Sequence, residues 1–353
     1  METVLTIIQG KGTLPREQAG RNIHYDDASL ANYKKVEQGD FIIHLRSFEG
    51  GLEMANEDGI VSPAYTILRC KKPHSSLFYE AYFHTDEFIN HILSKSVEGI
   101  RDGRQISYEA FKWLGLPYCD VSEQEKIAQL FCTLGHRIEK QQQMIDALKK
   151  YKRGLFNQIF SAISKGSQRR KLRELVHVSG GKTPSMSNSL YWNGDIVWIS
   201  SKDMKSSRIF GSELKITNLA LNEMTLYHPG TLLLVARSGI LKHSLPLAIL
   251  EVDATINQDI KALQVHGCNA FYLYYAILSQ EDTIIRTLVK TGTTVQSLMM
   301  DSFLNIEIPT PDIDQQQRII DKLAKLEKYV EVQEKELSLL SQMRNDLLQQ
   351  LFI

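Results

Sequence analysis

A long internal repeat constrains the fold of this 353-residue chain more than any other feature of its sequence. Residues 122–160 align without a gap on residues 314–352. The identical pairs are Gln124/Gln316, Ile127/Ile319, Leu134/Leu326, Glu139/Glu331, Gln141/Gln333, Leu148/Leu340, Leu155/Leu347, Gln158/Gln350 and Phe160/Phe352, and Pro117/Pro309 and Asp120/Asp312 extend the match upstream. One shared register of this length indicates a duplicated unit rather than two unrelated amphipathic helices.

Each copy of the repeat is predicted to form one long helix. Apolar residues recur in steps of three and four over residues 127–159, and the same steps return over residues 319–351. A period of 3.5 residues is typical of a coiled-coil seam. Ser122 or Asp314 can cap the first turn of its helix. Because the chain order is domain, helix, domain, helix, we expect the two helices to pair antiparallel and bury both seams.

The predicted seam is broken at equivalent places by Gln141 and Gln333, each near the middle of its helix. In an antiparallel pair the two middles face each other, so the two amides are expected to meet. A buried amide is costly unless it is paired, and such a pair would fix the register of the helices. The alternative is that both glutamines lie at the edge of the seam and reach water.

The segments before the two helices are predicted to be mixed α and β. Short apolar runs bounded by Gly and Pro indicate strands at 4–8, 40–45, 65–69, 196–199, 231–236 and 261–265, and a helix is expected at 270–279. The predicted fold class is therefore α+β, with pseudo-two-fold internal duplication. The expected parts are a first domain (1–116), a first helix (117–163), a second domain (168–310) and a second helix (311–353). The first domain has no counterpart of Lys171–Pro184, so we expect it to be short at its N-terminal side.

Composition and charge exclude several classes of protein. The net charge is zero, so no global basic field indicates nucleic acid, although local patches can still bind phosphate. The four cysteines lack CxxC spacing, which is typical of a reduced, cytosolic protein without a zinc site. No apolar run approaches the ~18–20 residues of a membrane span.

Gly181-Lys182-Thr183 lacks the upstream glycine of a phosphate-binding loop, because Val176 stands there. No Asn/Asp-Pro-Pro-aromatic tetrapeptide of an adenine methylase is present, so we expect neither an active site nor a bound cofactor or metal in this chain.

Basic and hydroxyl side chains follow predicted strands, or lie in loops, in both halves of the chain. Such side chains suit contacts with DNA phosphates and base edges. A solvated loop is the simpler interpretation of any one of them, but as a set in duplicated positions they predict DNA contact. The candidates are Arg46, Ser47, Arg101, Arg104, Gln105, Lys182, Lys202, Arg237, Ser238, Lys290, Thr293 and Thr294.

Several motifs resemble one known family in combination. They are GGKTPS…YWNGDIVWISSKDM at 180–204, PGTLLLVARSG at 229–239 and TGTTVQSLMMDSFLNIEIPTP at 291–311. Over residues 168–353 the sequence resembles the specificity subunit of type I restriction–modification systems. The first half resembles the same family through VLTIIQGKG, NYKKVEQGDFI, GIVSPAY and LPYCDVSEQEKI.

The resemblance implies two target recognition domains separated by two antiparallel helices. Each domain would read one half of a split, asymmetric site in double-stranded DNA, and the helices would set the gap. It also implies that the chain is not catalytic. Two modification subunits would methylate adenine with S-adenosylmethionine, and two restriction subunits would use ATP and Mg to translocate and cleave DNA. The competing interpretations are a coiled-coil adaptor or decoy, and a fragment of a fused restriction–methylation enzyme.

Overall fold

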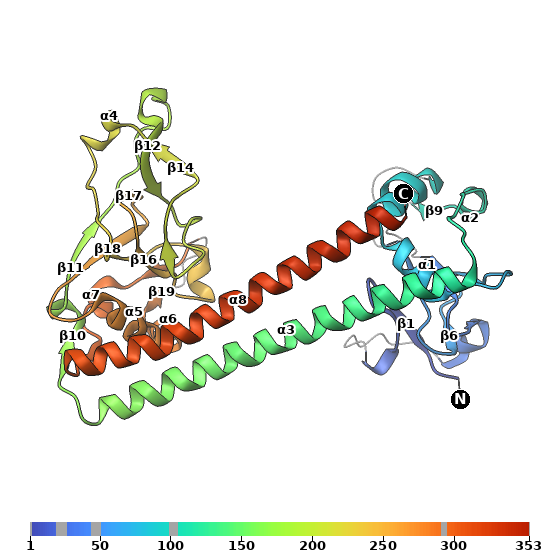
Figure 1. Ribbon diagram of the computed structural model, residues 1–353, viewed down its shortest axis with the longest axis horizontal. Coiled ribbons are helices and arrows are strands. Elements are labelled where there is room, and N and C mark those ends of the chain that lie inside the picture. Colours follow the sequence, from blue (N-terminus) through green and yellow to red (C-terminus); the bar gives the residue numbers. More distant parts are fainter. Residues whose placement is uncertain (1, 19–26, 44–50, 99–104, 291–294, 353) are drawn as a thin grey trace. The chain divides into compact units, whose positions relative to one another are not determined.

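The computed structural model describes residues 2–18, 27–43, 51–98, 105–290 and 295–352 (Figure 1). The chain forms two compact units, of which the first is Met1–Met144 with Gln333–Ile353 and the second is Ile145–Val332. Each unit combines a mixed α and β domain with a part of both long helices, α3 (Val121–Ser164) and α8 (Ile313–Leu351). The α+β class and the two long helices were predicted correctly.

The two long helices begin at equivalent positions, directly after a duplicated aspartate. Asp120 Oδ1 accepts a hydrogen bond from the backbone N of Glu123 at 3.1 Å, and Asp312 Oδ1 accepts one from Gln315 N at 2.8 Å. Each carboxylate satisfies an N–H group that the first helical turn leaves without a partner. The expectation that Ser122 or Asp314 caps the helix was wrong, because both residues lie inside the first turn.

Within the first unit α3 and α8 pack antiparallel. Arg137 Nη2 lies 3.2 Å from Glu336 Oε1, and Gln141 Nε2 lies 3.0 Å from Gln333 Oε1. A residue further along α3 therefore contacts a residue earlier in α8, as an antiparallel pair requires. Phe131 of α3 is among the residues buried in the core of this unit. In the second unit the same two helices are joined by the ion pair between Lys152 and Glu327.

The apolar stripe of α8 changes its spacing at its C-terminal end. The repeat predicted Leu351 in the seam, but this side chain is 43% exposed, and Leu348 and Phe352 are buried instead. The ring of Phe352 lies 5.1 Å from the ring of Phe78 and 5.3 Å from that of Tyr82, both on helix α1. The C-terminal end of α8 thus packs beside α1 as well as α3 (Figure 1). Which of its residues are buried therefore depends on both neighbouring helices and not on the coiled-coil period alone.

The domain of the first unit is built around one small antiparallel sheet with strand order β5-β4-β7, accompanied by the two-stranded sheets β1-β2, β3-β6 and β8-β9. Its helix α1 is almost wholly apolar and supplies five of its eight residues to the core. The elements are β1 (Leu5–Ile8), β2 (Gly12–Pro15), η1 (Arg16–Gln18), η2 (Asp27–Asn32), β3 (Lys34–Val36), β4 (Phe41–Ile43), β5 (Leu52–Met54), β6 (Gly59–Val61), β7 (Thr66–Leu68), α1 (Ser76–Phe83), η3 (Glu87–Ile92), η4 (Leu93–Ser96), β8 (Val97–Glu98), β9 (Gln105–Ile106) and α2 (Tyr108–Phe111).

The domain of the second unit is larger and has two main sheets. One is five-stranded with order β11-β18-β15-β16-β13, and the other is three-stranded with order β14-β12-β17. The elements are β10 (Arg169–Lys171), η6 (Leu172–Glu174), β11 (Val176–Gly180), η7 (Ser189–Tyr191), β12 (Trp192–Ile199), β13 (Arg208–Ile209), β14 (Leu214–Ile216), α4 (Asn218–Leu221), β15 (Leu232–Val235), η8 (Gly239–Lys242), β16 (Leu247–Leu250), β17 (Ala254–Ile256), β18 (Ile260–Val265), α5 (Ala270–Leu278), α6 (Glu281–Leu288), β19 (Val289–Lys290), β20 (Ser297–Leu298), α7 (Met300–Phe303) and β21 (Glu307–Pro309).

Helix α5 holds the same place in the second unit that α1 holds in the first. Both are short, apolar helices that pack on the long helices through aromatic side chains. Tyr272 lies 5.9 Å from Phe160 of α3, and Tyr275 lies 5.6 Å from Phe156 (ring centroids). Among the described residues, no helix has both the length and the apolar character needed to cross a membrane.

Candidate nucleic-acid interface

Three strands of the second unit end at the same edge of the domain. Strands β12 and β17 run parallel with Ile199 beside Ile256, and β15 runs antiparallel to β18 with Val235 opposite Ile260. The backbone N of Asn257 donates to Ile199 O at 2.9 Å, and Ala236 N donates to Asp259 O at 2.8 Å. The loops that follow β12 and β15 therefore gather around the turn that joins β17 to β18.

Lys182 reaches this edge on a rigid backbone. Its N–H donates to Ile256 O at 3.0 Å, and its carbonyl accepts a hydrogen bond from the indole Nε1 of Trp198 at 3.1 Å. A Cβ atom on the preceding residue, Gly181, would lie 1.9 Å from Ile256 O, so only glycine permits this close approach. The lysine side chain itself is exposed.

Lys202 lies in the loop after β12, and this loop is also fixed. Asp203 Oδ2 accepts hydrogen bonds from Ser200 N at 2.8 Å and from Ser200 Oγ at 2.7 Å, while its Oδ1 accepts one from Glu213 N at 2.9 Å. The carboxylate thus closes the loop on itself and on the chain beyond it. The side chain of Lys202 is exposed between these anchors.

Arg237 and Lys290 are brought together by Ser297. Lys290 pairs with Ser297 in the β19–β20 hairpin, and Arg237 forms an antiparallel bridge with the same residue. Ser238 lies next to them, and its backbone N donates to Gln296 O at 3.0 Å. The Ser238 hydroxyl accepts a hydrogen bond from Ile240 N at 3.4 Å, so it caps the short helix η8.

Lys182, Lys202, Arg237 and Lys290 are here called the cationic edge. All four are exposed, and the ion pairs found among the described residues include none of them. Other basic side chains of the same unit are paired, since Arg208 Nε lies 2.7 Å from Glu251 Oε1. Cations that are not neutralised in ion pairs raise the local positive potential, although the net charge of the chain is zero.

Two amide side chains at this edge were not predicted from the sequence. Gln258, in the turn after β17, hydrogen-bonds through its Oε1 to the Thr183 hydroxyl. Gln296 is 2% exposed, and within the described part of the chain its Oε1 has no hydrogen-bond partner. Glutamine is common in loops, so the sequence alone held no signal for either residue.

Seven further residues were predicted to contact DNA. Arg46, Ser47, Arg101, Arg104, Thr293 and Thr294 lie outside the described residues. Gln105 begins β9 opposite Glu98, and its side chain also lies outside the description. The structure therefore brings together Lys182, Lys202, Arg237, Ser238 and Lys290, and contact with DNA stays a prediction for every candidate.

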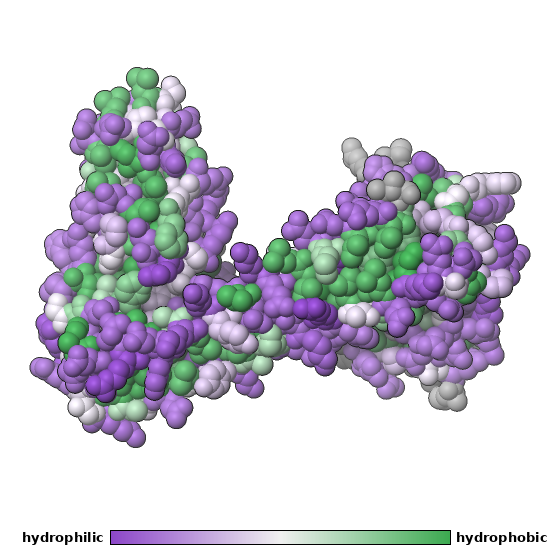
Figure 2. Space-filling view, in the orientation of Figure 1, coloured by the Kyte–Doolittle hydropathy of each residue, from purple (hydrophilic) through white to green (hydrophobic). Residues whose placement is uncertain are grey.

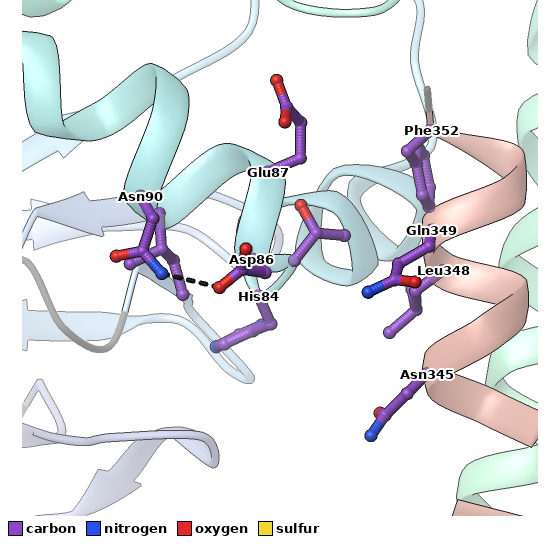
Figure 3. Close-up of a pocket in the computed structure, with 10 residues that line it drawn as sticks. His84, Asp86, Glu87, Asn90, Asn345, Leu348, Gln349 and Phe352 are labelled. Carbon is purple, nitrogen blue, oxygen red and sulfur yellow. Dashed lines mark hydrogen bonds between the residues drawn. The ribbon is translucent and has the colours of Figure 1, made fainter. Parts of the chain in front are cut away.

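The first unit contains a cavity of about 730 Å³ whose chemistry is different (Figure 3). His84, Asp86, Glu87 and Asn90 line one side, and the other side is formed by α8 through Asn345, Leu348, Gln349 and Phe352. The carboxylates of Asp86 and Glu87 in this cavity would repel phosphate. Over the described residues, no group of three or more His, Cys, Asp or Glu side chains is arranged to hold a metal ion.

The two glutamines predicted to set the register meet in the middle of the helix pair. Gln141 Nε2 donates to Gln333 Oε1 and to Gln333 O, both at 3.0 Å, and the two side chains are 8% and 7% exposed. The alternative of two amides that reach water at the edge of the seam is thus not what the structure has. Whether this pair sets the register stays a prediction.

Solved structures with a similar fold are known. The S subunit of a type I restriction–modification system from M. genitalium has a TM-score of 0.60 and 15% identity, over 91% of this chain and 84% of that one. A chain from a structural study of complex assembly and conformational transition in a type I R-M system has a TM-score of 0.58 and 16% identity, over 90% and 83% of the two chains.

Curated relatives are more similar in sequence over part of the chain. The specificity subunit of the type I restriction enzyme EcoR124I/EcoR124II from Escherichia coli is 38% identical over 44% of this chain and 40% of its own length. The MjaIX specificity subunit from Methanocaldococcus jannaschii is 30% identical over 52% of this chain and 43% of its own length. The match thus spans less than half the length of either relative. The family described as type I restriction modification DNA specificity domain matches residues 164–342, which is half of the chain, and the chain belongs to this family.

Proposed function

We propose that this chain is the DNA sequence-recognition subunit of a type I restriction–modification complex. In this proposal each unit reads one half of a split, asymmetric site in double-stranded DNA. The observation that carries the proposal is the cationic edge, where Lys182, Lys202, Arg237 and Lys290 converge without acidic partners among the described residues. Family membership and the names of the curated relatives support it.

The edge offers two kinds of contact with DNA. Lysine acts as a point charge toward a phosphate oxygen, whereas the planar guanidinium of arginine can donate two hydrogen bonds to O6 and N7 of guanine. We assign phosphate contacts to the three lysines and base contact to Arg237. Because the backbones of Lys182 and of the Lys202 loop are fixed, little backbone entropy is lost when these side chains engage the duplex.

The proposed complex contains further subunits that do the chemistry. Two modification subunits would carry S-adenosylmethionine and methylate adenine, two restriction subunits would use ATP and Mg, and the chain itself would not be catalytic. We place the complex in the cytoplasm. An apolar patch over the C-terminal part of α8 in the first unit, where Leu339 and Met343 are exposed, offers a surface for a partner subunit (Figure 2).

The proposal is tested by co-expressing the chain with the modification subunits of its own system and sequencing the methylated adenines of the host genome. We expect one motif with two unlike halves and a fixed gap. DNA binding by the complex should weaken steeply with salt, because each phosphate contact releases counterions. A complex that assembles but methylates no defined motif would overturn the proposal in favour of a coiled-coil adaptor.

A further inference from the structure

A duplicated glutamine ties each domain to the start of its long helix. In the first unit Gln124 Oε1 accepts a hydrogen bond from Ser75 N at 2.9 Å, and its Nε2 donates to Cys119 O at 2.9 Å. In the second unit Gln316 Oε1 accepts from Asn269 N at 2.9 Å, and its Nε2 donates to Pro311 O at 2.9 Å. The two amides thus make the same pair of contacts in the two halves of the chain.

A duplicated tyrosine adds a third contact next to each glutamine. Tyr79 Oη donates to Pro117 O at 3.1 Å, and Tyr272 Oη donates to Pro309 O at 2.6 Å. Both tyrosines lie on the short apolar helix of their domain, α1 or α5, and both prolines lie on the segment that leads into the long helix. Each glutamine and its tyrosine together are here called a helix tie.

The glutamine joins elements that are distant in sequence. Ser75 and Asn269 are the residues that precede α1 and α5, so each amide holds the N-terminus of a domain helix against the first turns of α3 or α8. Gln124 is fully buried and Gln316 is 3% exposed. Loss of either amide would leave a half-buried backbone N–H, and a half-buried or buried backbone C=O, without its partner.

The hydrogen bonds of the helix ties can fix an orientation, which apolar packing cannot. Hydrophobic burial depends on area and hardly on orientation, so it lets an aromatic helix rock on a long helix at low cost. Hydrogen bonds weaken steeply with angle. In each unit two of them join the domain helix to the long helix or its lead-in segment, and the third fixes the glutamine amide against the residue five positions before it. The ties are the same in both halves although the domains differ, since the main sheet has order β5-β4-β7 in the first unit and β11-β18-β15-β16-β13 in the second.

We propose that Gln124 with Tyr79, and Gln316 with Tyr272, are positioning residues that fix the angle at which each recognition domain leaves its long helix. Because the helices connect the two domains, these angles determine the spacing at which both half-sites of the DNA are engaged. The second statement rests on the proposed function, whereas the first concerns the protein alone. A glutamine that only stabilised the fold would leave the spacing preference unchanged.

The angle is tested within the second unit, without DNA. Spin labels on Lys215→Cys in β14 and Lys325→Cys in α8, in a chain whose other cysteines are replaced, report the distance between domain and helix by pulsed electron resonance. We expect one narrow distance distribution for the parent chain and a broader one for Gln316→Met. Tyr272→Phe removes a single hydroxyl and keeps the ring, so it should broaden the distribution less without risk to folding. The matched control is Gln350→Met, an exposed glutamine of the same repeat. Distributions as narrow as the parent's for both test variants would overturn the positioning role.

The consequence for DNA is tested with the complete methylating complex on substrates whose gap is varied by single base pairs. We expect Gln124→Met and Gln316→Met each to reduce the discrimination between the native gap and its neighbours about tenfold, as the loss of buried hydrogen bonds implies. Base preference within each half should not change, and Gln158→Met should behave as wild type.

Unchanged discrimination in a complex that methylates a split motif overturns the link to spacing. Failure of the wild type to methylate any split motif would instead overturn the proposed function, and the spin-label distances would still decide the angle.

Discussion

Four buried glutamine side chains form hydrogen bonds between separate elements of this chain. Gln124, Gln141, Gln316 and Gln333 are each less than a tenth exposed, and each is hydrogen-bonded to a different element of the fold. A buried amide without partners costs free energy, so such a residue specifies one arrangement against its alternatives. At the scale of single residues, we therefore expect these polar contacts to set the positions of the elements.

Arg237 is the residue of the cationic edge whose chemistry suits direct reading of a base. We expect Arg237→Ala to weaken binding of the complete complex by roughly 1–3 kcal/mol, and only for sites that carry the preferred base in one half. Arg318→Ala, an exposed arginine on α8, is the matched control. Equilibrium binding to duplexes with single base changes measures both. An equal loss of affinity on every sequence would mean that Arg237 contacts phosphate instead.

His84 makes the stability of the first unit depend on pH. Its ring lies 3.4 Å from the buried carboxylate of Glu53, which also accepts hydrogen bonds from Gly10 N and Gly12 N. Burial lowers the pKa of His84, but hydrogen bonds and the charges of Glu53 and Glu80 outweigh it, so the pKa is raised. A raised histidine pKa stabilises the fold below its ordinary value near pH 6.5, and this contribution disappears as pH rises through the raised value.

We therefore expect His84→Gln to lower the free energy of unfolding most below about pH 6.5, with the deficit shrinking at higher pH. Urea denaturation of both proteins across this range measures the difference. His136→Gln, an exposed histidine on α3, should show no such trend. A deficit that is the same at acid and alkaline pH would show that the effect is one of packing and not of charge.

The residues of the cationic edge could be proposed from the sequence one by one, but their convergence could not. Lys182, Lys202 and Arg237 follow different strands, and only the strand order brings their loops to the same turn. The helix ties escaped prediction for a related reason. The partners of Gln124 and Gln316 are backbone groups, which carry no sequence signature, and the repeat showed only that these glutamines are identical.

At the scale of elements, the contact between Gln141 and Gln333 leads to a prediction about the stability of the helix pair. Gln333→Leu removes the side-chain acceptor of the buried Gln141 amide and leaves it only the backbone carbonyl of residue 333, and we expect a loss of about 1–3 kcal/mol in the free energy of unfolding. The double variant Gln141→Leu with Gln333→Leu should recover most of this loss, because two apolar side chains can fill the same space. Chemical denaturation of the single and double variants measures the coupling, with exposed Gln129→Leu as control. Additive effects of the two substitutions would mean that the amides do not depend on each other.

The long helices were the most predictable elements, because a period of 3.5 residues sustained over the repeat has few other interpretations. Their ends were less predictable. Asp120 and Asp312 cap the two helices, whereas Ser122 and Asp314 had been predicted to do so. Leu351 was predicted in the seam but is exposed. A helical period read from the sequence does not show which polar residue caps the first turn, nor that the end of α8 packs against α1 as well as α3.

At the scale of the whole chain, the duplication shows which structural features the two units share and in which features they differ. The two units share the capping aspartates, the helix ties and the antiparallel helix pair, and they differ in the sheets of their domains. Shared parts are suited to holding a domain in place, whereas the diverged parts are suited to reading different sequences. This division predicts that the domains can be exchanged while the helices stay.

Replacing residues 168–310 by the corresponding block of another specificity subunit is the direct test of that division. We expect the methylated motif to change in one half only, with the other half and the gap unchanged, because the first unit and both long helices keep their own residues. The incoming block must keep a tyrosine and an N-terminal helix residue that can pair with Gln316, since these contacts set its angle. The reciprocal exchange of residues 1–116 is the control and should change the other half. Genome-wide sequencing of methylated adenines reads out both chimeras. A chimera whose motif changed in both halves at once would show that the two units do not read DNA independently, and the split-site proposal would then be wrong.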